Sequence, residues 1–124
     1  MIILDTCVLI AFSDSANPFH LDAQRILAAT EQLAITAISG AELMVHPPPE
    51  LVPRWQAMLR AFAVEVIPIT ADDLESIARV RRESHLKMPD ATVLWAAQTR
   101  AAAVASFDRR LLDQAKRWGL RAMS

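Results

Sequence analysis

Short apolar runs alternate with helical patterns along the chain, and this alternation restricts the possible folds more than any other feature of the sequence. The predicted strands are residues 2–4, 33–36, 64–69, 103–107 and 120–122. The predicted helices begin at about residue 6 and continue with residues 18–29, 39–46, 53–62, 71–83, 89–100 and 109–118. Strands that are apolar throughout are covered on both faces, and strands separated by helices usually pair in parallel. The sequence therefore predicts an α/β fold, with a mostly parallel sheet of four to five strands and helices on both faces.

The composition is that of one globular domain, which we expect to span residues 1–124. Hydrophobic residues make up 53% of the chain and charged residues 22%, which excludes a disordered chain. Cys7 is the single cysteine, which excludes a disulfide framework, and with three histidines it argues against a structural zinc site. No apolar run reaches the ~18–20 residues of a membrane span, and Asp5 interrupts the apolar N-terminus, which makes it a poor signal peptide. We therefore expect a cytoplasmic protein without membrane association.

The charge is distributed unevenly although the net charge is only −1. Residues 1–78 hold three Lys or Arg against ten Asp or Glu, a formal charge of −7, whereas residues 79–124 hold ten against four, a charge of +6. Such asymmetry indicates either a polyanionic or charged partner, or solvated helix faces whose two halves neutralise each other. The charge alone favours the second interpretation.

Four acidic residues occupy positions that converge on one edge of the predicted sheet. Asp5 follows the first strand directly, and Asp108 follows the strand at residues 103–107. Glu42 and Asp90 lie on the otherwise apolar stripes of two predicted helices. In open parallel sheets the functional site lies beyond the carboxyl ends of the strands. These four acids are therefore the candidate functional residues.

Each acid also has an ordinary structural interpretation. Asp5 and Asp108 can cap the helices that follow them. Glu42 can complete a capping box that starts at Ser39, and Asp90 can complement the positive end of a helix. If all four carboxylates converge, however, their mutual repulsion raises their pKa values unless a cation joins them.

An all-oxygen set of carboxylates favours Mg²⁺, with Mn²⁺ as an alternative, over zinc. We expect Asp5, Asp90 and Asp108 to bind such a metal directly or through water, and Glu42 to bind it or to position a water molecule. Three hydroxyl groups are placed to orient the acids or to bond water, although each can equally be a local cap. They belong to Thr6, Ser39 and Ser106.

Four sequence blocks carry a resemblance to a known family. They are ILDTCVLI at residues 3–10, TAISGAEL at 36–43, PDA with LWAA within 89–97, and ASFDRRL at 105–111. In these blocks, and in their order, the sequence resembles the PIN-domain ribonucleases, most closely their VapC-type toxins. The resemblance implies a three-layer fold with a parallel sheet, Mg²⁺-dependent RNA cleavage, a homodimer and inhibition by a small VapB-type antitoxin.

By position, the family's metal-binding acids correspond to Asp5, Glu42, Asp90 and Asp108, and its hydroxyl residue corresponds to Ser106. The sequence departs from the family at Cys7, where Asn is common, and it lacks the Gly that often precedes the last strand. Neither departure affects the acids. We interpret Cys7 as a small buried residue rather than as a nucleophile.

Basic residues that flank Asp90 and Asp108 in sequence are the candidate contacts for RNA phosphates. Such contacts give salt-dependent affinity that is largely independent of sequence, but the same residues can equally form a solvated face. The candidates are Arg81, Arg82, Lys87, Arg109 and Arg110.

Two other functions compete with the metal-dependent ribonuclease. A phosphoacceptor receiver domain has a similar length, but it needs an acidic pair after the first strand, where Asp5 stands alone. A catalytically silent PIN-like domain that binds protein or RNA is the second alternative, although all four acids are present. Residues 51–62 carry an apolar stripe that can pack in the core or accept an antitoxin segment, and the core is the preferred interpretation.

Overall fold

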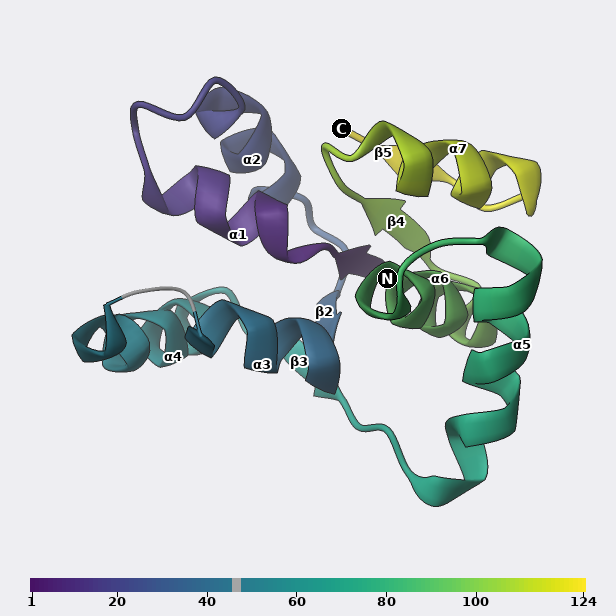
Figure 1. The fold of residues 1–124 in the computed structure, drawn as a ribbon. Coiled ribbons are helices and arrows are strands. Elements are labelled where there is room, and N and C mark those ends of the chain that lie inside the picture. Colours follow the sequence, from purple (N-terminus) through teal and green to yellow (C-terminus); the bar gives the residue numbers. More distant parts are fainter. Residues whose placement is uncertain (46–47) are drawn as a thin grey trace.

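The structure is a computed structural model that describes residues 1–45 and 48–124. Its centre is a five-stranded sheet in the order β3-β2-β1-β4-β5, and all neighbouring strands are parallel (Figure 1). The strands are β1 (Ile2–Leu4), β2 (Leu33–Thr36), β3 (Glu65–Ile67), β4 (Ala103–Ala105) and β5 (Ala122–Met123). The predicted α/β fold with a parallel sheet is confirmed.

Seven α-helices are present in the described part of the chain. They are α1 (Thr6–Ser13), α2 (His20–Leu27), α3 (Ala37–Val45), α4 (Val52–Ala61), α5 (Leu74–Ser84), α6 (Met88–Arg100) and α7 (Arg109–Arg117). Short 3₁₀ helices at Pro49–Leu51 and Ala71–Asp73 precede α4 and α5. The predicted end of the third helix at His46 lies outside the described residues. Within the described ranges, no helix combines the length and the apolar character that crossing a membrane requires.

The helices cover both faces of the sheet because side chains alternate between its faces. On one face Ile3, Ala34 and Val104 pack with side chains of α5, α6 and α7. On the other face Ile2 and Ile35 pack with side chains of α1, α2, α3 and α4. β1, β2 and β4 are buried throughout, which explains why their sequences are continuous apolar runs rather than alternating patterns, whereas β3 exposes Glu65 and Val66.

The strand order reverses between β1 and β4, which lie side by side at the middle of the sheet. From β1 the chain builds outward to β2 and β3, then crosses over to β4 and β5. In parallel sheets a reversal of this kind leaves an opening beyond the carboxyl ends of the two central strands. Asp5 and Asp108 follow these two strands, so the topology places both acids at this opening.

Candidate active site

Asp5 is held by the strand beside it rather than by the helix that follows it. Its backbone N–H donates to the carbonyl of Ala105 at 2.9 Å, which fixes the end of β1 against β4. Its Oδ2 accepts a hydrogen bond of 2.7 Å from the hydroxyl of Ser106 and a longer one of 3.3 Å from the thiol of Cys7. Asp5 occupies the N-cap position of α1, but its side chain makes no capping bond, so the capping interpretation is wrong here. Its carboxylate is instead aligned toward the end of β4.

Ser106 connects the first and last acids of the candidate site. While its hydroxyl donates to Asp5, the same oxygen accepts a hydrogen bond of 2.9 Å from the backbone N–H of Asp108. Asp108 in turn caps α7, because its Oδ1 accepts from the N–H groups of Arg110 at 2.8 Å and Leu111 at 3.3 Å. Both capping bonds go to Oδ1, so the capping interpretation of Asp108 is confirmed and is compatible with a further role for this carboxylate.

Glu42 is free of the capping role that its sequence position suggested. The helix begins at Ala37, two residues before the expected start, and the N–H of Ser39 donates to the hydroxyl of Thr36 at 3.0 Å. Ser39 is therefore inside the helix, and the predicted capping box is wrong. Partial burial, followed by the negative charge of Asp5, raises the pKa of Glu42 above its ordinary value.

Asp90 lies within the electrostatic influence of the other three acids. Partial burial first, and then the negative charges of Asp5, Asp108 and Glu42, together raise the pKa of Asp90 to about 6, against an opposing effect of Lys87. Burial and nearby like charges both disfavour the ionised carboxylate. Four carboxylates from four separate elements therefore share one electrostatic environment.

The donor atoms of this cluster fit a hard divalent cation, because all four side chains offer oxygen and their repulsion favours a bound positive charge. Among the described residues, no group of three or more His, Cys, Asp or Glu side chains forms a ready metal site. The oxygen donors and the negative charge of the four acids therefore suit Mg²⁺ or Mn²⁺, although in the described residues these side chains do not form a metal-binding group.

Buried hydroxyl groups join the two helices that carry Glu42 and Asp90. The hydroxyls of Thr36 and Thr92 lie 3.2 Å apart, and that of Thr92 also donates to the carbonyl of Pro89 at 2.6 Å. Both threonines are fully buried, so this contact fixes the end of β2, where α3 begins, against the N-terminal half of α6. The sequence analysis missed these positioning residues, although a threonine at the end of a buried strand was the available signal.

Thr6 and Ser39 do not contact the acids through the hydrogen bonds that the structure gives them. The hydroxyl of Thr6 donates to the carbonyl of Ser39 at 3.3 Å, and the hydroxyl of Ser39 accepts from Thr36 at 3.2 Å. These bonds join α1 to α3 and support the backbone around the site. Of the three predicted hydroxyl residues, Ser106 alone is hydrogen-bonded to one of the acids in the described part of the chain.

Cys7 supports the site as a neutral thiol. Burial, and then the negative charge of Asp5, raise the pKa of Cys7 to about 12. The thiol therefore stays protonated at neutral pH, and it cannot act as a thiolate nucleophile. Besides donating to Asp5, its Sγ accepts from the N–H of Phe107 at 3.4 Å and lies 3.6 Å from the hydroxyl of Ser106. Its polar contacts are thus with the carboxyl ends of both central strands.

All five candidate basic residues are exposed, but they do not occupy one location. Lys87 is the N-cap residue of α6 and acts electrostatically on Asp90. Arg109 and Arg110 form the first turn of α7, directly after Asp108. Arg81 and Arg82 lie in the last turn of α5. Arg82 also lines a separate hollow between acidic residues of α5 and its preceding turn, and none of the four candidate acids lines that hollow.

The family of this chain follows from its sequence as a whole. The model of the PIN domain matches residues 2–117. The chain belongs to the PIN domain family. This membership confirms the resemblance and removes the receiver-domain alternative. A comparison with curated protein sequences finds no match.

Solved structures of other PIN proteins share this fold. A toxin–antitoxin complex from Klebsiella pneumoniae is 28% identical over 87% of each chain, with a TM-score of 0.70. VapC20 from Mycobacterium tuberculosis is 18% identical, over 97% of this chain and 96% of its own, with a TM-score of 0.76. FitAcB from Neisseria gonorrhoeae is 20% identical, over 100% of this chain and 97% of its own, with a TM-score of 0.73. The structural neighbours of this PIN domain are therefore VapC- and FitB-type toxin–antitoxin proteins.

Proposed function

We propose that this PIN domain is a Mg²⁺-dependent endoribonuclease and the toxin of a VapBC-type toxin–antitoxin pair in the cytoplasm. The observation that carries this proposal is the influence of three other carboxylates on Asp90, whose pKa is raised to about 6 by burial and then by the negative charges of Asp5, Asp108 and Glu42. A similar structure supports it, because VapC20 from Mycobacterium tuberculosis is a toxin that cleaves the sarcin-ricin loop. A phosphodiester of RNA is therefore the proposed substrate.

In this proposal Asp5, Asp90 and Asp108 hold the metal, and Glu42 binds it or positions the attacking water. Mg²⁺, or Mn²⁺ in its place, would lower the pKa of a water molecule and offset the charge of the phosphate. Ser106 keeps the carboxylate of Asp5 aligned through its 2.7 Å hydrogen bond. Cys7 adds a second donor to the same carboxylate oxygen.

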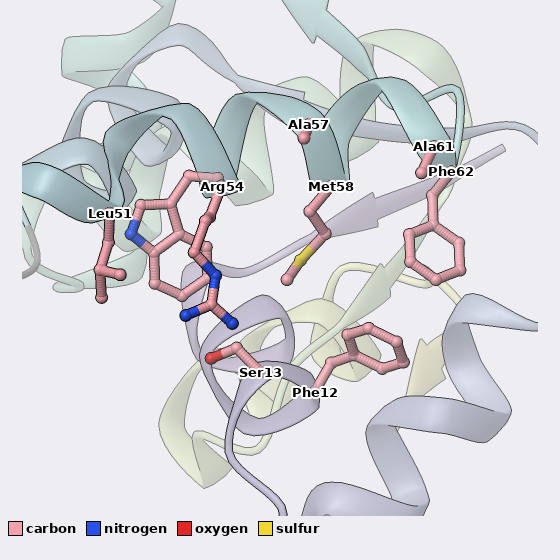
Figure 2. Close-up of a pocket in the computed structure, with 9 residues that line it drawn as sticks. Phe12, Ser13, Leu51, Arg54, Ala57, Met58, Ala61 and Phe62 are labelled. Carbon is pink, nitrogen blue, oxygen red and sulfur yellow. The ribbon is translucent and has the colours of Figure 1, made fainter.

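The proposed partner is a small VapB-type antitoxin, and the proposed assembly is a homodimer. Similar structures are toxin–antitoxin complexes, which supports a protein inhibitor. An apolar groove of about 450 Å³ between α1 and α4 offers room for an antitoxin segment (Figure 2). Phe12, Met58 and Phe62 line this groove, and the side chain of Arg54 extends across it. Trp55 itself is buried, so the predicted core role of this helix holds for its inner side.

A catalytically silent binding module remains the second candidate function. It is favoured by one observation, namely that the described acids do not form a ready metal site. One assay distinguishes the two functions: antitoxin-free protein is incubated with pooled cellular RNA in Mg²⁺ and in EDTA, and cleavage is compared. Discrete fragments that require the metal support the nuclease. Intact RNA with a folded, metal-loaded sample would support the binding module.

Replacing Ser106 with alanine is expected to lower Mg²⁺ affinity or cleavage activity by about 10- to 100-fold. The variant removes the donor to Asp5 and the acceptor for the N–H of Asp108, so the two acids lose their shared alignment. Titrating activity against Mg²⁺ tests this prediction, with Ser13→Ala as a control because that hydroxyl is exposed and donates to the backbone carbonyl of Ile10 rather than to an acid. An unchanged Mg²⁺ dependence would contradict the positioning role.

Charge reversal at both Arg109 and Arg110 is expected to weaken RNA binding and to reduce its salt dependence. Each lost contact with a single-stranded phosphate lowers the slope of log affinity against log salt by about 0.7. The double variant Lys116→Glu/Arg117→Glu is the matched control, because it makes the same charge change in the last turn of α7. Equal affinity of the parent and the Arg109/Arg110 variant at low salt would argue against phosphate contacts at this helix start.

A further inference from the structure

Two phenylalanine rings lie stacked beside the candidate acids. Phe19 and Phe107 are nearly parallel, with an interplanar angle of 8° and ring centroids 4.6 Å apart. Phe107 directly precedes Asp108 and packs against the hydrophobic core. Phe19 covers Phe107 and is itself 44% exposed. The stack therefore extends outward from the core and ends in a solvent-exposed aromatic ring.

The same hollow contains the aromatic rings and two of the acids. It measures about 340 Å³, and its lining includes Asp5 and Asp108 together with Phe19 and Phe107. A group bound at the acids would therefore have the exposed ring as its neighbour. The hollow combines a carboxylate end with an apolar, aromatic end.

Phe19 is held in place by a hydrogen-bonded turn between α1 and α2. The side chain of Asn17 accepts from the N–H of Phe19 at 2.9 Å, and the N–H of His20 donates to the carbonyl of Asn17 at 3.0 Å. The Nδ1 of His20 lies 3.0 Å from the carbonyl of Ala11, and the imidazole stacks on Phe12. These contacts order the turn before any ligand binds, so a ligand that contacts Phe19 would lose little conformational entropy in the protein.

We propose that Phe19 is a stacking platform for one nucleobase of a single-stranded RNA, next to the phosphodiester that lies at the acids. This inference rests on the proposed function. Aromatic faces bind bases of unpaired RNA, because every base has a flat face and no base pair must be read. A neutral ring also avoids the repulsion that the nearby carboxylates exert on phosphates. The platform thus selects for unpaired nucleotides, with little preference among the four bases.

Binding of base-free RNAs tests this proposal. The protein carries Asp5→Asn so that the RNA stays intact, and its affinity is measured in Mg²⁺ for short single-stranded RNAs that each lack one base. Stacking of a base on an aromatic residue is worth about 1–3 kcal/mol, which corresponds to ~5- to 150-fold in affinity. We expect one abasic position to weaken binding by this amount when Phe19 is present. With Phe19→Leu, the affinity for the complete RNA falls by a similar factor, and removing the base at that position causes no further loss of affinity.

Two further variants separate stacking from a structural role. Phe19→Tyr keeps the aromatic face and is expected to retain both the affinity and the abasic effect. Leu21→Ala removes an exposed apolar side chain from the first turn of α2, which directly follows Phe19, and it is expected to change neither. Thermal unfolding of each variant verifies that the fold is kept. If every abasic RNA loses the same affinity with Phe19 and with Phe19→Leu, the proposal is overturned. If no RNA binds in any arm, and none binds to protein that retains Asp5, the proposed function fails as well.

Discussion

Replacing Asp5 with asparagine is expected to reduce Mg²⁺-dependent RNA cleavage by about 10²–10³-fold or more, because a bound metal supplies several kcal/mol of transition-state stabilisation. Asparagine has the size of aspartate and still accepts a hydrogen bond from Ser106, which now bonds Oδ2 at 2.7 Å. The amide lacks the negative charge that the metal requires. The fold is therefore kept while the metal site is weakened.

The control for this substitution is Asp113→Asn, which removes an exposed carboxylate in the middle of α7. Cleavage of pooled RNA is followed for the parent, Asp5→Asn and Asp113→Asn at equal concentration, together with Mg²⁺ titrations. Only Asp5→Asn is expected to lose activity, and its thermal unfolding temperature is expected to stay close to that of the parent. Normal turnover by Asp5→Asn would remove Asp5 from the catalytic machinery and would sink the proposed mechanism.

The fold was predictable from the sequence because its central strands β1, β2 and β4 are short and buried on both faces. Ile2–Leu4 and Leu33–Thr36 are each buried throughout, so neither could be mistaken for a half-exposed strand. The positions of Asp5 and Asp108 after strands were also sufficient to place them at one edge, given parallel pairing. The hydrophobic pattern and the parallel pairing were therefore sufficient to predict the fold class and the edge of the sheet at which the acids lie.

The local contacts of the acids depended on helix boundaries, which the sequence did not determine. The expected start at Ser39 made a capping box with Glu42 plausible, whereas the helix begins at Ala37 and Thr36 accepts the N–H of Ser39. Thr36 and Thr92 are 56 residues apart, and only tertiary packing reveals their hydrogen bond. Likewise, the pairing of Phe19 with Phe107 follows from the turn between α1 and α2.

Replacing Asp90 with asparagine is expected to stabilise the metal-free protein at neutral and higher pH. The pKa of Asp90 rises from an ordinary value of 3.8 to about 6, through burial first and then the charges of the other acids. Folded protein therefore binds this proton more tightly than the unfolded chain. The stabilisation from Asp90 is fully present below about pH 4, and it is lost as the pH rises through about 6. Because the carboxyl is only half-buried, we expect the loss to be about 1–2 kcal/mol.

Urea unfolding in EDTA between pH 4 and pH 8 measures this effect as the difference between parent and Asp90→Asn. The difference is expected to grow in favour of the variant between pH 4 and pH 7, whereas Asp113→Asn follows the parent at each pH. Added Mg²⁺ is expected to reverse the order at pH 8, because a metal that binds only the folded parent stabilises it by mass action. A parent whose stability relative to Asp90→Asn is independent of pH would show that neither burial nor the neighbouring carboxylates raise the pKa of Asp90 in the folded protein. If Asp90→Asn is the more stable protein in EDTA at pH 8 and the parent is the more stable protein in Mg²⁺, the carboxylate of Asp90 destabilises the metal-free protein and is required for metal binding. The instability of the metal-free site then comes from the negative charge that the metal is expected to neutralise.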